Sequence, residues 1–532
     1  MPVTMRLLLL LSALSLLVQA HSLRAASRPN IIFILCDDLG YGDVHCLNPE
    51  GKIATPHLDR LAAEGMIFTD AHSGSSVCTP TRYGLMTGRY AWRTKLQSGV
   101  LGGLSPRLIE QGRLTVPSFL KQNGYHTACV GKWHLGMNWV RTGEVSELSI
   151  EKPNQVKNVD YSQPIANGPT RVGFDSYFGI SASLDMVPYC FIENDRVVEH
   201  PTETTKIPMN DSKGGFSREG PGSPGFRGED VLPTFTQRAL KIIEEKAAAS
   251  KNGKPFFLYM PLNSPHTPIV PNPKWRGKSG LSLYADFVME TDDAIGQIMT
   301  ATEQNGISQD TLIIVTSDNG CSPSADFPLH LSKGHNPSHS LRGHKADIYD
   351  GGHRVPFIVR WPAKVQGGQK TSQLTCLTDL MATAADILGQ KLPDNAAEDS
   401  FSFLPSLQGQ KNAAARSNII HHSINGSFAI REESLKLELC ADSGGWSDPR
   451  PGHAPKGSPE SQLYDLSIDI GEQTNLISSK PEAAAKLEAL LNKQISEGRS
   501  TPGAAQKNAV DVVLRKAVSS TLKGAKGKKT IP

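Results

Sequence analysis

Three runs of apolar residues, each followed at once by polar side chains, constrain the fold of this chain most strongly. The runs are Asn30–Cys36, Pro255–Met260 and Thr311–Thr316. Runs that are apolar throughout are typical of strands buried on both faces of a sheet. Helical patterns at Val231–Ala249 and Tyr284–Glu303 separate them. The sequence therefore predicts an α/β fold, with a large, mixed, mainly parallel central sheet flanked by helices.

Acidic and amide side chains follow the first and third of these runs. Asp37 and Asp38 come directly after the first, and Asp318 and Asn319 after the third. The carboxyl ends of such strands are where α/β proteins place their ligands. A single Asp there would suit a turn or a helix cap, but a pair of carboxylates suits a metal better. Hard oxygen donors of this kind are typical of calcium or magnesium sites.

A cysteine stands at the start of a predicted helix between these strands. Pro80 suits the first helical turn and Thr79 suits the N-cap, so Cys78 is expected just outside the positive helix end. Arg82 follows about one turn later and can turn back towards it. The thiol could be buried and inert, or a nucleophile whose pKa is lowered by its surroundings. A phosphatase-type loop would need its Arg at position 84, which is Gly84.

A third interpretation of Cys78 rests on a family. The pattern C-x-P-x-R followed by T-G-R resembles the signature of the type I sulfatases, in which this Cys is oxidised to formylglycine. Thr81 stands where the family most often has Ser, and it keeps the hydroxyl. Further blocks follow in the family's order: D-D, G-K-W-H, a His loop, D-N-G, G-H-K and L-Y-D-L. The resemblance implies an alkaline phosphatase-like fold and hydrolysis of sulfate esters.

The resemblance also implies a metal site. Its ligands would be Asp37, Asp38, Asp318, Asn319 and an oxygen of the formylglycine made from Cys78. We expect Ca²⁺ rather than Mg²⁺. Two-zinc relatives in the wider superfamily commonly carry His where this chain has Asn319, so the amide favours one oxygen-ligated ion.

Three further residues acquire catalytic roles through the same resemblance. Arg82 and Lys132 would hold the nucleophile and the anion. One hydroxyl of the formylglycine hydrate would attack sulfur as the alcohol departs. His134 would then take a proton from the second hydroxyl, which expels sulfate and restores the aldehyde. A plain Ser or Cys ester lacks that second hydroxyl.

Substrate contacts are implied for residues elsewhere in the chain. Lys345 and His266 would bind the sulfate and assist the leaving oxygen. Ser183 would also contact the sulfate, with Ser181 as a possible substitute. The polar segments Met137–Thr170 and Glu199–Glu229 are long enough to build sugar subsites. The expected substrate is therefore a sulfated carbohydrate, such as a glycosaminoglycan.

Other functions stay open on the residues alone. The alternatives are a phosphonate or phosphate monoester hydrolase on the same scaffold, an arylsulfatase of small aryl esters, and an inactive glycan-binding relative. The net charge of +3 gives no argument for nucleic acid as a partner. A formylglycine-generating enzyme, or an equivalent maturase, is an implied partner.

The chain divides into four predicted parts. Residues 1–20 read as a signal peptide, with cleavage after Ala20 (Ala26 is the alternative), so we expect export to the periplasm or secretion. The catalytic domain is expected over 27–405. A smaller α+β domain with a short antiparallel sheet is expected over 415–500, and a basic Lys/Ala-rich tail over 501–532.

Finer expectations concern secondary structure, membrane spans and disulfides. Further helices are predicted at Thr55–Phe68, with Thr55 as the cap, Pro56 as the first helical residue and Gly65 as the stop, and at Leu374–Leu388. A hairpin is predicted at Ser427–Ile430 and Leu435–Leu439. Outside the signal peptide, no run is apolar enough to span a bilayer. The spacing of the eight cysteines fixes no disulfide pairing.

Overall fold

The computed structural model describes residues 28–143, 157–208, 216–410 and 415–515. The predicted signal peptide and the basic tail beyond residue 515 lie outside these ranges. None of the helices in the described part of the chain is long and apolar enough to cross a bilayer.

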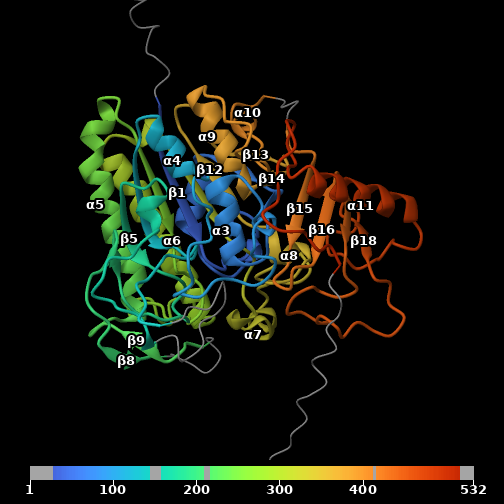
Figure 1. The fold of residues 1–532 in the computed structure, drawn as a ribbon, viewed down its shortest axis with the longest axis horizontal. Coiled ribbons are helices and arrows are strands. Elements are labelled where there is room, and N and C mark those ends of the chain that lie inside the picture. Colours follow the sequence, from blue (N-terminus) through green and yellow to red (C-terminus); the bar gives the residue numbers. More distant parts are fainter. Residues whose placement is uncertain (1–27, 144–156, 209–215, 411–414, 516–532) are drawn as a thin grey trace, which may run out of the picture.

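A ten-stranded sheet forms the centre of the molecule (Figure 1). Its strands, from one edge to the other, are β13 (Gln369–Thr371), β2 (Met66–Phe68), β12 (Phe357–Arg360), β11 (Thr311–Ser317), β1 (Asn30–Cys36), β10 (Phe256–Pro261), β4 (His126–Lys132), β5 (Ser176–Ile180), β6 (Ile192–Glu193) and β7 (Arg196–Val197). The middle strands, β11 to β5, are parallel, whereas β12, β6 and β7 pair antiparallel. The predicted mixed, mainly parallel sheet is confirmed.

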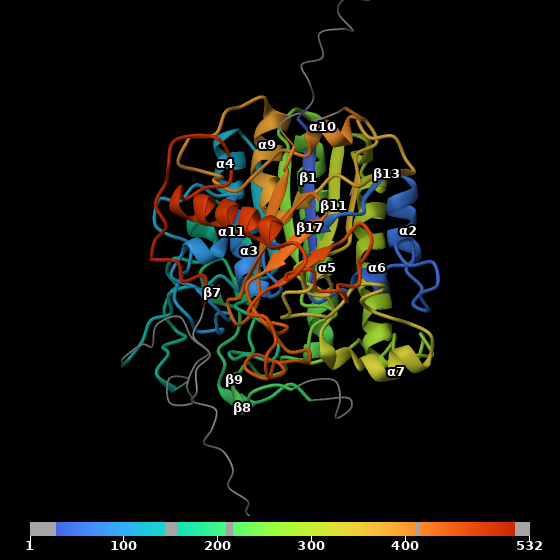
Figure 2. The same ribbon diagram turned by 90° about the vertical axis from the view of Figure 1, so that its right-hand side faces the viewer.

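Helices cover both faces of this sheet, as Figure 2 shows. One face carries α3 (Cys78–Thr87), α4 (Val116–Gln122) and α9 (Leu380–Leu388), and the other carries α2 (Pro56–Ala63), α5 (Val231–Lys251) and α6 (Leu283–Gln304). Side chains of β1 alternate between the two layers: Phe33 packs with the first set and Ile34 with the second. The continuous apolar runs are explained by this burial on both sides.

A second, four-stranded antiparallel sheet lies beside the first, at the right of Figure 1. Its strands are β15 (Asn418–His422), β16 (Phe428–Glu432), β17 (Leu435–Glu438) and β18 (Gln462–Asp465), and α11 (Pro481–Ser496) packs on it. The predicted hairpin is the pair β16–β17. Tyr90 and Trp92, from the N-terminal part of the chain, complete the core of this unit.

Pairing with a sheet delimits two of the predicted helices. The helix predicted within Thr55–Phe68 runs from Pro56 to Ala63, in agreement with the predicted first residue Pro56 and the predicted stop at Gly65, and the three residues after Gly65 join the large sheet as β2. The helix predicted over Leu374–Leu388 begins only at Leu380. Residues before it form β14 (Thr375–Cys376), which pairs with β3 (Ala71–His72). This second helix is shorter than expected, because a sheet partner distant in sequence outweighs local helix propensity.

Short elements complete the fold. They are α7 (Phe327–Ser332), α8 (Asp350–His353), α10 (Leu404–Leu407), β8 (Glu203–Thr205) and β9 (Gly220–Gly222). Figure 1 places α7, β8 and β9 below the large sheet, on the side where β1 ends.

Candidate active site

The polar residues that follow the central strands meet at one edge of the sheet. Strands β11, β1, β10 and β4 are neighbours, and their registers align their carboxyl ends. This brings Asp318 and Asn319, Asp37 and Asp38, His266, and Lys132 towards one point. Parallel pairing is the physical reason why Asp38 and Asn319, which are 281 positions apart, share one site.

Two cations hold the carboxylates that follow β1 and β11. Lys132 Nζ lies 2.5 Å from Asp37 Oδ2. Arg82 donates from Nη2 and Nε to Asp318 Oδ2, at 2.7 and 3.2 Å, and its Nη1 donates to the Lys132 carbonyl at 2.9 Å. All four side chains are fully buried. Burial opposes ionisation of Asp37, but Lys132, His266 and Arg82 hold its pKa well below the usual value.

Asp38 is the centre of a second set of contacts. Its carboxylate lies 2.7 Å from Lys345 Nζ, and Asn319 Nδ2 donates to it at 2.7 Å. His266 Nε2 is 3.7 Å from the same carboxylate. Asp38 adopts φ +66°, a left-handed conformation that is costly for a residue with a Cβ. Such a conformation is retained where surrounding contacts fix it, as these three do.

Cys78 is the first residue of α3, and Val77 is its N-cap. The expectation that Thr79 would be the cap is wrong. Its hydroxyl instead accepts a hydrogen bond from the backbone N–H of Leu101 at 3.1 Å. Burial raises the pKa of the Cys78 thiol, although Lys132 and Lys345 oppose the rise. The unmodified thiol is therefore poorly suited to act as a thiolate nucleophile.

The other cysteines show no sign of crosslinking. All eight fall within the described ranges, and there they form no disulfide.

His134 is held as a neutral imidazole. Its Nε2 donates to the Leu101 carbonyl at 2.7 Å, whereas Nδ1 is buried and meets no hydrogen-bond partner among the described residues. Burial, with the positive charges of Lys132 and Arg82, lowers its pKa well below the usual value. The free lone pair on Nδ1 is therefore able to accept a proton at neutral pH.

Ser183 lies in the loop after β5, which is the strand next to β4. Its hydroxyl is buried and, within the part of the chain that is described, has no hydrogen-bond partner. Two residues on, Asp185 forms an ion pair with Arg218 at 2.7 Å. This pair ties the Ser183 loop to the segment that follows residue 215.

Sequence reasoning missed the residues that support Asp38 from behind. Asp43 is buried and accepts hydrogen bonds from the Gly40 backbone, at 2.9 Å, and from the Tyr284 hydroxyl. The Tyr284 hydroxyl is also 3.2 Å from the Asp38 carbonyl. The acidic residue at position 43 is visible in the D-D-L-G-Y-G-D run, but nothing local to Tyr284 indicates this role.

The oxygen atoms of this site fit a divalent cation. Asp37 Oδ1 and Asn319 Oδ1 are buried, and neither has a hydrogen-bond partner in the described structure. Burial and the nearby Asp37 charge raise the pKa of Asp318 to about 7. One ligand atom each from Asp37, Asp38 and His266 lies within 4.8 Å of the others. Unpaired carboxylate and amide oxygens of this kind suit a hard ion such as Ca²⁺ or Mg²⁺.

Comparison with known proteins identifies sulfatases as relatives of this chain. A family profile described as Sulfatase matches residues 29–390. An N-acetylgalactosamine-6-O-sulfatase of Bacteroides thetaiotaomicron is 34% identical over 529 residues, covering 91% of this chain and 98% of the relative. Arylsulfatase A of Homo sapiens is 32% identical over 498 residues, covering 90% of each.

A solved structure has the same fold. It was described in connection with the metabolism of multiple glycosaminoglycans by Bacteroides thetaiotaomicron. It shares 33% identity with this chain, has a TM-score of 0.74, and covers 88% of this chain and 99% of its own.

Proposed function

This chain belongs to the sulfatase family and is a sulfuric ester hydrolase, and from that premise we propose that its substrate is a 6-O-sulfated amino sugar within a glycosaminoglycan or a related glycan. The observation that carries the proposal is the match to an N-acetylgalactosamine-6-O-sulfatase over nearly its whole length. The match covers 91% of this chain and 98% of the relative.

The proposed nucleophile is formylglycine at position 78, installed by a maturase. When hydrated, this residue supplies two hydroxyl groups on one carbon. The buried, protonated thiol supports the need for modification, because it offers no thiolate. Lys132, Lys345 and Arg82 surround the position with positive charge, which suits a sulfate anion and the oxygens of the nucleophile.

Asp37, Asp38, Asp318 and Asn319 would hold Ca²⁺, with Mg²⁺ as the second choice. The ion would act as a Lewis acid on the sulfate oxygens. The other roles belong to side chains of the protein. Lys345 neutralises the charge of the sulfate, and His266, whose pKa is lowered by burial, orients it through a hydrogen bond. Both favour departure of the leaving oxygen, while Arg82 fixes Asp318 and the end of β4.

His134 is the proposed base for releasing sulfate. Its Nε2–H is committed to the Leu101 carbonyl, so only Nδ1 is available to take a proton. Its lowered pKa keeps that nitrogen unprotonated at neutral pH. General base catalysis of this type contributes a rate factor of about 10²–10⁴.

We further propose that the enzyme is exported and acts in the periplasm or outside the cell. The apolar run at Leu7–Val18, with Arg6 before it, supports this. Direct sequencing of the N-terminus of the protein from its native host would test it, with Ala20 as the expected cleavage point and an intact Met1 as the contrary result.

The substrate is tested by a panel of sulfated sugars. The enzyme, made in a host that generates formylglycine, would be given N-acetylgalactosamine 6-sulfate, N-acetylgalactosamine 4-sulfate, N-acetylglucosamine 6-sulfate and a small aryl sulfate, free and within oligosaccharides. We expect the highest kcat/KM for a 6-O-sulfated amino sugar. Equal or faster hydrolysis of the aryl ester than of every saccharide would overturn the carbohydrate assignment.

A further inference from the structure

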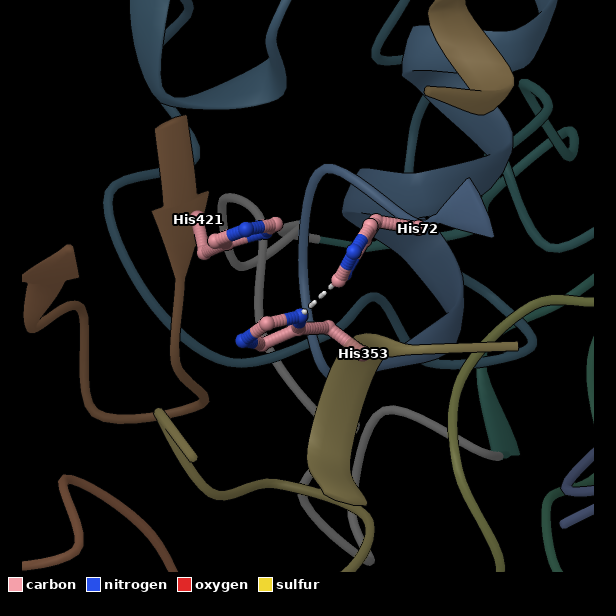
Figure 3. Close-up of side chains that lie close together, drawn as sticks. All are labelled: His72, His353 and His421. Carbon is pink, nitrogen blue, oxygen red and sulfur yellow. Dashed lines mark hydrogen bonds between the residues drawn. The ribbon is translucent and has the colours of Figure 1, made fainter. Parts of the chain in front are cut away.

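Three buried histidines meet where the two sheets adjoin. His72 lies in β3, His353 ends α8 and His421 lies in β15. Their exposed fractions are 0%, 1% and 0%. Figure 3 shows the three rings gathered from three separate segments of the chain. None of the three belongs to the site described above, and the mechanism does not use them.

Each ring has one nitrogen held from outside the cluster. His72 Nε2 lies 2.8 Å from the Asp70 carboxylate. His353 Nε2 lies 3.0 Å from the Ile348 carbonyl, and His421 Nδ1 lies 3.3 Å from the Ser73 carbonyl. A ring nitrogen facing a carboxylate or a carbonyl carries the proton. Metal-binding histidines are oriented in this manner, with the outer N–H donated to an oxygen.

The other nitrogens face one another. With the outer nitrogens protonated, the inner ones carry lone pairs, and His72 Nδ1 is only 3.1 Å from His353 Nδ1. His421 Nε2 is buried and has no hydrogen-bond partner within the described residues. One ligand nitrogen from each ring lies within 4.8 Å of the other two. Lone pairs this close repel unless a cation or a proton lies between them.

We propose that His72, His353 and His421 form a second, structural metal site that binds one Zn²⁺ ion. Imidazole nitrogens suit zinc, copper and nickel, whereas calcium prefers oxygen donors. Zn–N bonds of about 2.0–2.1 Å at tetrahedral angles place two ligand nitrogens about 3.3–3.4 Å apart. The observed 3.1 Å separation of the two Nδ1 atoms is close to this value.

The surroundings fit an ion at this point. Burial lowers the pKa of all three imidazoles, which keeps them in the neutral form that binds metal. The positive charge of Lys436 next to His353 is offset by Asp350, whose pKa Lys436 holds well below the usual value against the effect of burial. Glu438 and Glu472 also contact Lys436, and burial raises the pKa of both. Asp70, which holds the outer nitrogen of His72, also lines a surface cleft of about 690 Å³.

The ion would crosslink the two halves of the molecule. His72 and His353 belong to the part built on the large sheet, and His421 to the four-stranded sheet. His353 and His421 stack with ring centroids 3.5 Å apart and planes 11° apart. A shared ion cannot lie in both parallel ring planes, so binding turns one of these two rings out of the stack.

The competing explanation is that hydrogen bonds within the protein hold the clustered histidines, with no metal ion. Lys436 Nζ is 3.2 Å from His353 Nε2. If the lysine donates there, His353 Nδ1 carries the proton and donates it to His72 Nδ1. A continuous hydrogen-bond chain from Asp70 to Lys436 would then need no metal. The two explanations differ in whether the folded protein takes up zinc.

Metal uptake by the whole protein distinguishes them. The full chain would be stripped with a chelator, returned to excess Ca²⁺, and titrated with Zn²⁺ by calorimetry and with Co²⁺ by its visible absorption. We expect one equivalent of zinc to bind, and an intense, tetrahedral-type Co²⁺ spectrum. His421→Gln should abolish both, and Asp70→Asn should weaken zinc binding about 10- to 100-fold by releasing the outer nitrogen of His72.

His422→Gln is the matched control, since it changes the neighbouring histidine of the same strand. It should keep the full zinc equivalent. The wild-type measurement decides the question even if a variant misfolds: absence of a zinc equivalent in the calcium-loaded wild type overturns the proposal. Retention of that equivalent by folded His421→Gln protein overturns it as well.

Discussion

At the scale of single residues, position and environment support the chemical role proposed for His134. It follows Trp133, the first residue after β4, and it adopts φ +56°. That conformation aims Nε2 at the Leu101 carbonyl and leaves Nδ1 free. The same conformation guides the choice of substitution, because Asn tolerates a positive φ better than most residues.

Replacing His134 by Asn should slow turnover without preventing substrate binding. The variant keeps the fold but loses the base, so we expect kcat to fall by about 10²–10⁴ with little change in KM. Steady-state kinetics on the preferred saccharide would measure this. His126→Asn, at the half-buried start of the same strand, is the control and should retain its kcat. A His134→Asn variant with wild-type kcat would remove His134 from the mechanism.

The raised pKa of the buried Glu290 side chain predicts how the stability of the protein depends on pH. Burial raises its pKa to about 7, and among the described residues its Oε1 has no hydrogen-bond partner. The unfolded chain loses this proton near pH 4.5, whereas the folded chain keeps it until about pH 7. The contribution of Glu290 to stability is therefore fully present below pH 4.5 and is lost as the pH rises through 7.

Glu290→Gln removes that titration. We expect the variant to gain stability over wild type as the pH increases, from almost no difference at pH 5 to about 1–3 kcal/mol at pH 8. Urea unfolding at both pH values would measure the difference. A difference of the same size at pH 5 and pH 8 would show that Glu290 does not titrate as described.

At the scale of elements, close approach of two strands positions Lys132. Gly131 in β4 has φ +142°, and a Cβ at this residue would lie 1.8 Å from the Pro261 carbonyl oxygen of β10. No side chain fits in that space. The glycine therefore lets β4 pack against β10 closely enough for the next residue, Lys132, to reach Asp37.

Gly131→Ala should disturb both the sheet and the site. We expect a loss of about 2–4 kcal/mol in the free energy of unfolding, together with a loss of activity as Lys132 moves. Gly253→Ala is the control. Gly253 also has a positive φ, but no described atom lies within 4 Å of its added Cβ. Gly253→Ala should lower the free energy of unfolding by only about 1–2 kcal/mol and leave kcat unchanged. Equal losses of stability in Gly131→Ala and Gly253→Ala would show that the contact with Pro261 does not matter.

The elements also show where sequence reasoning succeeds and fails. The apolar runs predicted β1, β10 and β11 to within a residue or two, because burial on both faces leaves a strong pattern. The start of α3 was misplaced because the hydroxyl of Thr79 is used by Leu101, which is 22 residues away. No local sequence pattern indicates that a hydroxyl expected to cap a helix instead accepts a hydrogen bond from a distant residue.

At the scale of the whole molecule, buried charges join the two sheets. Lys436 of β17 lies 2.9 Å from Asp350, 2.6 Å from Glu472 and 3.2 Å from Glu438. Its side chain and the three carboxylates are all fully buried. Removing one partner from such a set leaves uncompensated buried charge.

Lys436→Met should therefore destabilise the whole protein by about 3–5 kcal/mol. Urea unfolding followed by both tryptophan fluorescence and far-ultraviolet circular dichroism would measure it. Lys486→Met provides the control, because Lys486 pairs with Glu432 on the surface and should change stability little. Equal stability of Lys436→Met and wild type would mean that the buried network does not hold the two sheets together.

Contacts between segments distant in sequence account for what the sequence could not predict. The ordered motifs indicated which residues would gather at the edge of the large sheet, because parallel strands bring their ends together. The histidine cluster was not predicted, since β3, α8 and β15 come together only when the second sheet docks. The support that Tyr284 gives to Asp38 also depends on tertiary packing across 246 residues.

The central claim is that this sulfatase works through a modified Cys78, and one measurement tests it most directly. Free sulfate and free phosphate would be assayed on matched 6-O-sulfated and 6-O-phosphorylated amino sugars, using wild type and Cys78→Ala, with conversion at position 78 confirmed by peptide mass. We expect sulfate release by the converted wild type, at least about 10³-fold faster than by Cys78→Ala, and little phosphate release. Sulfate release by Cys78→Ala at the wild-type rate, or faster release of phosphate than of sulfate by fully converted enzyme, would contradict the account.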